Sequence, residues 1–325
     1  MSHLTYVEAI VVGAFQGVTE LFPVSSLGHS VLVPALVGGS WAKDLDVTAA
    51  ESPYLPFIVG LHVATAAALM VFFWRDWVRI VRGLVSSARH RRVRHPDERL
   101  AWLLVLGTIP VGIAGLALDH VFRSTLGRPM PAAAFLVVNG VILLVGERVR
   151  RTAPVRVADT QLAVPSGTVS TTYVGRPGGS AEPVRDDGLS EDERSDRRLA
   201  GLSYGRAMII GSAQILGLLP GISRSGSTMV AGLLRGLDHE DCARFAFLLA
   251  TPAIGAAGVL KLPDLFGPTG AGIQGQVLVG SLASFVAAYL SVRFLTRYFQ
   301  TRTLTPFAIY CMVAGALAFV WLAVR

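Results

Sequence analysis

Two short segments of this sequence place chemically active side chains in apolar surroundings. The first, QGVTELFPVSSLGH, runs from Gln16 to His29 and also contains Glu20, Ser25 and Ser26. Gln16 and Glu20 are four residues apart and therefore share one face of a helix. Because a charged side chain within an apolar membrane segment costs about 2.5–3.5 kcal/mol on insertion scales, Glu20 indicates a functional site.

The second segment, PGISRSGST at residues 220–228, surrounds Arg224 with glycine and hydroxyl residues. The planar guanidinium suits phosphate oxygens, and glycines let backbone N–H groups approach an anion at a helix N-terminus. Together the two segments offer a carboxylate, an imidazole, a guanidinium and several hydroxyls. Phosphoryl transfer needs such groups, namely a nucleophile, a proton acceptor and positive charge on the nonbridging oxygens.

The elements that must position these groups are membrane-spanning helices. Of the 325 residues, 52% are hydrophobic and 16% are charged, and the mean hydropathy is +0.54. A soluble domain carries about 25% charged residues. The apolar residues form blocks of about 20, the length of a helix that crosses a bilayer. Six blocks predict full spans, at residues 54–74, 100–121, 131–145, 243–262, 276–299 and 306–324.

Two further apolar segments, 7–37 and 204–236, are interrupted near their centres by proline, glycine and serine. Irregular backbone at membrane depth is tolerated only where it is buried in protein or lines a wet cavity, so both segments are predicted to be re-entrant hairpins. The two segments also align without a gap. The alignment pairs Tyr6, Ala9, Gly13, Gln16, Leu21, Ser25 and Gly28 with Tyr204, Ala207, Gly211, Gln214, Leu219, Ser223 and Gly226.

This alignment predicts an all-α polytopic membrane protein built as an inverted-topology repeat. Residues 1–149 and 201–325 would each form one re-entrant hairpin plus three transmembrane helices, and the odd number of spans inverts the second half. Inverted repeats place a site near the membrane midplane, where the broken helices meet. The arginines between residues 74 and 100 predict that this loop is cytoplasmic and that both termini lie outside.

Residues 150–200 differ from both halves. They are rich in serine, threonine, proline, glycine and mixed charge, and cannot bury enough apolar surface to offset the entropy of ordering. We predict a mobile cytoplasmic linker. The net charge of +7 fits arginine-rich cytoplasmic loops and not nucleic-acid binding. Cys242 and Cys311 are expected to pack in the protein, and the histidines other than His29 to be structural or solvated, with His62 singled out for inspection.

The motifs QGVTE, PVSSLGH and PGISRSGST resemble those of the undecaprenyl-diphosphate phosphatase family, which is linked to bacitracin resistance. The resemblance covers nearly the whole chain apart from residues 150–200. It implies hydrolysis of undecaprenyl diphosphate to the monophosphate, which recycles the lipid carrier for cell-wall synthesis. It also implies a multi-pass protein of the bacterial inner membrane, a site open to the extracytoplasmic side, and a divalent cation, Mg²⁺ or Ca²⁺.

Carried over by position, the resemblance makes Ser26 and His29 the catalytic serine and histidine, and Arg224 the essential arginine of the second motif. Glu20 matches the acidic-motif carboxylate, with Gln16 in the first place of an (E/Q)xxxE pattern, and these two would bind the metal. Residues around them would bind substrate: Ser25, Gly28, Gly221, Ser223, Ser225, Gly226 and Thr228.

The sequence departs from the family pattern at three places. Gln16 replaces the commoner glutamate and removes an anionic metal ligand. Leu27 stands where threonine is common, and the 150–200 segment is unusually long. Two roles stay open. Either Ser26 attacks phosphorus while His29 takes its proton, or His29 is itself the nucleophile, and Glu20 either holds the cation or positions His29.

A rival class is a transporter of polyprenyl phosphate, because inverted repeats with broken helices are equally typical of carriers. The discriminating feature is the Ser26/His29 pair, since a carrier needs no nucleophile and base. The acid-phosphatase type of lipid phosphatase shares only the Ser-x-Gly-His fragment at residues 26–29. The expected partners are the polyprenyl diphosphate substrate and membrane lipids, and homodimerisation is left open.

Overall fold

The computed structural model describes residues 4–45, 54–121, 128–152, 190–267 and 272–324, and within these ranges the regular structure is helical. The first half contains α1 (Tyr6–Leu21), α2 (Ser26–Val37), α3 (Gly39–Asp44), α4 (Tyr54–Phe72), α5 (Trp74–His90), α6 (Pro96–Val121) and α7 (Pro129–Thr152). The second contains α8 (Glu191–Ala200), α9 (Tyr204–Ser212), the 3₁₀-helix η2 (Ala213–Leu218), α10 (Arg224–Leu234), α11 (His239–Phe266), α12 (Gln274–Thr301) and α13 (Thr305–Val324).

Five of these helices, α6, α7, α11, α12 and α13, are long and apolar enough to cross a bilayer. The sixth expected span, at residues 54–74, corresponds to α4. The chain bends by 86° between α4 and α5, and α5 carries several arginines. Large apolar side chains on the spans point outward, such as Leu116, Leu278 and Leu317, which are 75%, 72% and 68% exposed. Lipid is the solvent that accommodates such a surface. The prediction of an all-α polytopic membrane protein is confirmed.

Both interrupted segments are broken where the sequence indicates. The first break separates α1 from α2 at residues 22–25, and the second separates η2 from α10 at residues 219–223. Each new helix begins with a serine N-cap. The Ser25 hydroxyl accepts from the Gly28 amide at 3.2 Å, and the Ser223 hydroxyl accepts from the Gly226 amide at 3.1 Å. Capping satisfies amide groups that the helix itself leaves without partners.

Glycines let the broken helices approach the spans closely. A Cβ on Gly13 of α1 would lie 2.2 Å from the carbonyl oxygen of Gly280 in α12. In the same way, a Cβ on Gly211 of α9 would lie 2.2 Å from the carbonyl oxygen of Gly107 in α6. Small residues at such contacts are how helices pack in a membrane. Each hairpin is therefore held against a span from the other half of the chain.

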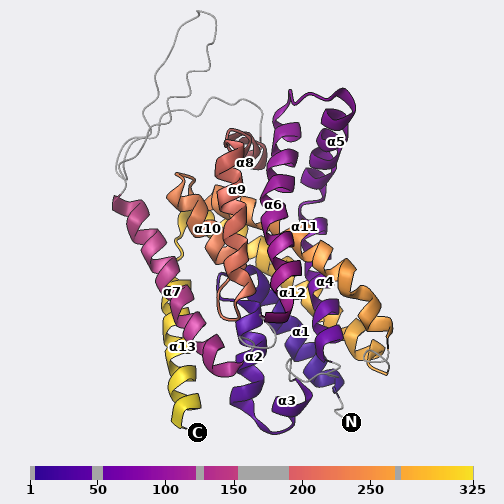
Figure 1. The fold of residues 1–325 in the computed structure, drawn as a ribbon, viewed down its shortest axis with the longest axis vertical. Helices are drawn as coiled ribbons and strands as arrows, with labels where there is room; N and C mark the ends of the chain where they lie inside the picture. The colour runs from indigo at the N-terminus through magenta and orange to yellow at the C-terminus, as the bar shows by residue number, and fades with distance from the viewer. Residues whose placement is uncertain (1–3, 46–53, 122–127, 153–189, 268–271, 325) are drawn as a thin grey trace, which may run out of the picture.

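The molecule has two distinct ends (Figure 1). Both termini lie at one end, and the turn between α5 and α6 lies at the other, together with α8. The span pairs α7/α13 and α4/α11 pack between these ends. The hairpins enter this bundle and bring their breaks into its interior.

The expectation of a mobile linker over residues 150–200 is wrong for its final part. Residues 153–189 lie outside the described residues, but residues 191–200 form α8. The mixed charge of this helix complements charges on α5 and α11 instead of facing only solvent. Arg244 of α11 contacts Asp192 at 2.7 Å and Asp196 at 2.8 Å, and Arg79 of α5 contacts Asp196 at 2.6 Å.

The start of α8 is fixed by a capping box. The Ser190 backbone amide and hydroxyl both donate to the Glu193 carboxylate, which lowers the pKa of Glu193. The end of the helix is held by Arg198, which contacts Asp241 of α11 at 2.7 Å. Helix α8 is thus a docked element at the end of the molecule opposite the termini.

Candidate active site

The two breaks contact each other in the interior of the bundle. The Ser25 hydroxyl, which caps α2, also accepts from the Gly221 amide of the second break at 3.1 Å. Gly221 has a φ of 109°, and a Cβ there would lie 2.4 Å from the carbonyl oxygen of Ala132. A Cβ on Gly28 would lie 2.7 Å from Gly221. Glycine is required at both positions because the loops meet backbone to backbone.

Asn139 of α7 ties the same two loops together. Its side-chain amide donates to the Pro23 carbonyl at 3.0 Å, and its carbonyl oxygen accepts from the Ser223 amide at 3.0 Å. Ser223 and Ser225 also donate to the Phe22 carbonyl, at 3.5 and 3.4 Å. Sequence reasoning missed Asn139, although a fully buried amide within an apolar span is itself a signal.

Glu20, the last polar residue of α1, is the centre of the polar cluster. One carboxylate oxygen accepts from the Arg224 guanidinium at 2.8 Å. The other accepts a short hydrogen bond from the Ser26 hydroxyl and lies 3.3 Å from Nε2 of His62. The Gln16 side-chain amide also donates to Glu20, at 3.4 Å. The structure therefore brings together four predicted site residues from α1, α2 and α10, and adds His62 from α4.

His29 lies close to this cluster in sequence but its ring has other partners. Nδ1 lies 2.7 Å from the Ser25 carbonyl oxygen, and Nε2 lies 2.8 Å from the hydroxyl of Tyr310 in α13. A carbonyl can only accept, so Nδ1 carries the proton and Tyr310 donates to Nε2. The Ser26 hydroxyl donates to Glu20 and not to His29. Tyr310 is a second residue that the sequence did not single out.

The residues expected to bind metal have partners of their own. The carbonyl oxygen of Gln16 accepts from Ser284 at 2.6 Å and from Thr65 at 3.1 Å, so it points toward α12 and α4. Glu20 is paired with Arg224 and His62. Among the described residues there is no group of three or more His, Cys, Asp or Glu arranged for a metal ion. These side chains do not fit a cation held by the protein alone.

Two helix N-termini converge on the cluster, since Ser26 begins α2 and Arg224 begins α10. Among the described residues, no partner is present for the backbone amides of Ser26 and Leu27, or for those of Arg224 and Ser225. Such amides, together with the positive end of each helix dipole, favour an anion.

The residues expected to bind substrate surround this point. The amides of Gly28, Gly221 and Gly226 are already engaged by the hydroxyls of Ser25 and Ser223, and the Ser223 amide is engaged by Asn139 of α7. The hydroxyl of Thr228 donates to the Arg224 carbonyl at 2.8 Å. These residues build the loops that present Ser26 and Arg224.

The two cysteines are free and buried, as expected of packing residues. The Asn139 amide donates to the Cys311 sulfur at 3.3 Å, so Cys311 contributes to the packing around the first break.

These features define a multi-pass helical membrane protein with a polar, anion-attracting site at the junction of two broken helices. A model of the bacitracin resistance protein BacA family matches residues 9–317. The chain belongs to this family, as its motifs indicate.

Relatives match over essentially the full length. A Mycolicibacterium paratuberculosis protein named undecaprenyl-diphosphatase is 68% identical, with 100% of this chain and 99% of that protein covered. A Mycobacterium avium protein of the same name is 67% identical, with the same coverage. A Frankia casuarinae protein named undecaprenyl-diphosphatase 1 is 54% identical, with 98% of this chain and 99% of that protein covered.

Proposed function

We propose that this protein hydrolyses undecaprenyl diphosphate to undecaprenyl phosphate and inorganic phosphate, the reaction named in its full-length relatives. The observation that carries the proposal is the Ser26 hydroxyl bonded to Glu20, which is in turn paired with Arg224. A nucleophile, a proton acceptor and a phosphate-binding cation thus lie in one cluster. The product re-enters the lipid-carrier cycle of cell-wall synthesis, and the family to which the chain belongs is associated with bacitracin resistance.

In the first step, the Ser26 oxygen attacks the terminal phosphorus. A bond forms between that oxygen and phosphorus, and the bond from phosphorus to the bridging oxygen breaks. The Ser26 proton passes to Glu20, its hydrogen-bond partner. The leaving group is the polyprenyl monophosphate, which departs with the bridging oxygen as an anion and needs no proton from the protein.

Arg224 and the free amides at the starts of α2 and α10 hold the nonbridging oxygens of the terminal phosphate. Positive groups fixed in advance where charge develops are the main source of catalysis in phosphoryl transfer. Before the second step, Glu20 releases the serine proton to bulk water. Water then attacks the phosphorus and Glu20 takes a proton from it. The bond from phosphorus to the Ser26 oxygen breaks, and Glu20 passes its proton to that oxygen as phosphate leaves.

This assignment gives Glu20 the role of base that the sequence had given to His29. The reason is geometric, since both ring nitrogens of His29 are occupied by Ser25 and Tyr310. His29 then positions the first turn of α2. The alternative, in which Nε2 of His29 attacks phosphorus, requires that nitrogen to leave Tyr310.

A divalent cation, Mg²⁺ or Ca²⁺, stays a prediction from the family resemblance, and no step above uses one. Within the cluster, the described residues offer it only the Glu20 carboxylate, which already pairs with Arg224 and contacts His62. Phosphate release in the presence and absence of a chelator tests this point. A chelator is expected to lower the rate only if the cation enters with the diphosphate.

We also propose the inverted repeat, for which the packing offers support. The first hairpin packs on α12 through Gly13 and Gly280, and the second packs on α6 through Gly211 and Gly107. Gly13 and Gly211 are aligned positions, as are the N-cap residues Ser25 and Ser223. In this arrangement the termini face the outside of the inner membrane and the site opens to that side. Residues 1–149 and 201–325 remain the proposed halves.

Transport of a polyprenyl phosphate is the competing function. A carrier would use Arg224 and the helix N-termini to bind the lipid phosphate, but has no use for a serine bonded to a carboxylate. The Ser26–Glu20 contact therefore favours the enzyme. The cluster is built from one chain, so hydrolysis does not require a homodimer.

The test is phosphate release from undecaprenyl diphosphate by the purified protein in detergent. The parent protein is expected to release phosphate, while Ser26→Ala and Arg224→Ala lose at least two orders of magnitude in rate. Ser30→Ala, in the first turns of the same helix, serves as a matched control and should retain activity. A folded parent protein that binds the lipid but releases no phosphate would support the carrier.

A further inference from the structure

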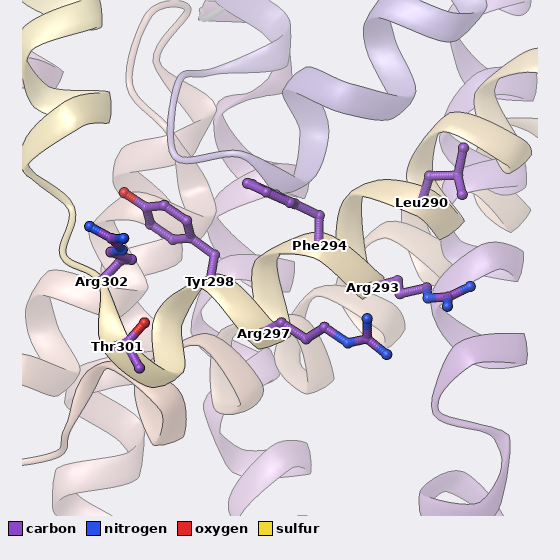
Figure 2. Close-up of a pocket in the computed structure, with 7 residues that line it drawn as sticks. All are labelled: Leu290, Arg293, Phe294, Arg297, Tyr298, Thr301 and Arg302. Atoms are coloured by element: carbon purple, nitrogen blue, oxygen red, sulfur yellow. The ribbon is translucent and has the colours of Figure 1, made fainter.

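A second charged feature lies at the C-terminal end of α12, outside the proposed active site. Here a surface hollow of about 440 Å³ is lined by Leu290, Arg293, Phe294, Arg297, Tyr298, Thr301 and Arg302, and Figure 2 shows these side chains. The lining residues from Leu290 to Thr301 recur every three to four positions and therefore form one face of the helix, and Arg302 follows as the residue after the helix end. We call this hollow the α12 groove.

The three arginines of the α12 groove have no acidic partner among the described residues. Arg293, Arg297 and Arg302 are exposed, and no Asp or Glu among the described residues forms an ion pair with any of them. Other arginines at this end of the molecule do, as in the contact of 2.7 Å between Arg198 and Asp241. The groove thus presents three uncompensated positive charges.

The same groove is apolar at its other end. Leu290 is 57% exposed and Phe294 is 51% exposed, on a helix that is a candidate membrane span. Figure 2 shows Arg302 beside Tyr298, and Arg293 and Arg297 extending from the same side of α12. A ligand that fits must combine an anionic head with an apolar tail. Guanidinium groups suit phosphate, and the apolar side chains suit an acyl chain.

The α12 groove is separate from the proposed active site. None of its lining residues belongs to the Glu20 cluster, and the ring of Phe294 stacks on that of Phe22, with centroids 5.9 Å apart and planes 3° apart. Phe22 lies in the first break and also contacts Phe307 edge to face. The groove therefore contacts the first break through the Phe294–Phe22 stack but shares no residue with the Glu20 cluster.

We propose that the α12 groove binds an anionic phospholipid of the surrounding membrane, with its phosphate on Arg293 and Arg297 and an acyl chain along Leu290 and Phe294. Arg302, which Figure 2 shows farther along beside Tyr298, adds positive charge at the other end of the groove. Basic pockets at the ends of transmembrane helices bind anionic headgroups by this combination of charge and apolar contact. The bound lipid stabilises the α12–α13 end of the bundle. The inference does not depend on the hydrolysis reaction.

The experiment measures lipid binding to the delipidated full-length protein by native mass spectrometry. The probes are phosphatidylglycerol and phosphatidylcholine with identical acyl chains. We expect the parent protein to retain one phosphatidylglycerol under conditions that strip phosphatidylcholine. Replacing all three groove arginines by glutamine should weaken the phosphatidylglycerol affinity by on the order of a hundredfold, and Arg297→Gln alone by about fivefold.

A matched control removes the same amount of charge elsewhere at the same end of the molecule. Arg89→Gln, Arg92→Gln and Arg94→Gln together replace three exposed arginines around the end of α5 and the turn that follows it. This triple variant should bind phosphatidylglycerol as the parent does. Thermal unfolding adds a second readout, because phosphatidylglycerol should raise the midpoint of the parent and control proteins but not that of the groove variant.

Several results would overturn the proposal. Equal affinity for the two phospholipids would remove the anionic component, and equal weakening in the groove and control variants would reduce it to general surface charge. Displacement by millimolar inorganic phosphate would indicate a free-anion site, and displacement by equimolar polyprenyl phosphate would make the product lipid the occupant. If the triple variant does not fold, unchanged binding in Arg297→Gln is the contradicting result. Hydrolysis is measured separately, so failure of one proposal leaves the other standing.

Discussion

Replacing Glu20 by glutamine separates the two roles that the structure gives to this residue. The amide oxygen can still accept from the Arg224 guanidinium, which lies 2.8 Å from the carboxylate, while the amide nitrogen that replaces the other oxygen can only donate to the Ser26 hydroxyl. It cannot take the serine proton. General-base catalysis contributes about 10²–10⁴-fold, equivalent to about 3–5 kcal/mol of barrier. We expect kcat to fall by that factor.

The same substitution should leave KM unchanged or lower it. In the parent protein Arg224 is shared between Glu20 and the incoming diphosphate, whereas in the variant its charge is free for the substrate. Steady-state phosphate release over a range of lipid concentrations gives both constants. Glu8→Gln is the matched control, because Glu8 also lies on α1 and only caps its N-terminus through Thr5.

The reasoning would be refuted if Glu20→Gln kept more than about a tenth of the parent kcat, since a base contributes more than that. A large rise in KM at unchanged kcat would also contradict it, because Glu20 would then act in binding and not in proton transfer. Thermal unfolding must show that the variant is folded before either result counts.

Three further outcomes follow from the contacts. Tyr310→Phe removes the donor to His29 and should cost about 1 kcal/mol of stability, measured by thermal unfolding, while kcat stays within about threefold; a loss of several orders of magnitude would make His29 catalytic. Asn139→Leu leaves the buried Ser223 amide without its partner and leaves the Pro23 carbonyl only the Cys311 thiol, at 3.8 Å, so it should cost about 2–4 kcal/mol. An unchanged unfolding midpoint would contradict the tie between the breaks. Asp196→Asn breaks a buried contact with Arg244 and should make α8 sensitive to limited proteolysis. Asp192→Asn, at an exposed contact with the same arginine, should not, and equal sensitivity of the two variants would be evidence against the docking of α8 through Asp196.

The positions of the helices and breaks could be predicted from sequence because the signals are local. Blocks of apolar residues set the spans, and proline, glycine and serine mark residues 22–25 and 219–223 as irregular. The bend of 86° between α4 and α5 could not be predicted from apolar length alone. The docking of α8 was missed because its charges pair with Arg79 and Arg244, which are distant in sequence.

The same division applies to the site. Ser26, Glu20 and Arg224 are recognisable as charged or nucleophilic groups inside apolar motifs, and the structure brings them together. The partner of Ser26 could not be read from the motif, since Glu20 lies close before it across the break and His29 lies one helical turn after it. That choice depends on Tyr310, a residue far along the chain that occupies the His29 ring.

The central claim is that Ser26 attacks phosphorus, and trapping of the phosphorylated enzyme tests it most directly. Rapid quenching during turnover of radiolabelled undecaprenyl diphosphate, followed by peptide mapping, should yield an acid-stable phosphoserine at Ser26. The label should be absent from Ser26→Ala. An acid-labile adduct on His29 would contradict the account and make the histidine the nucleophile, and turnover without any adduct would point to direct attack by water.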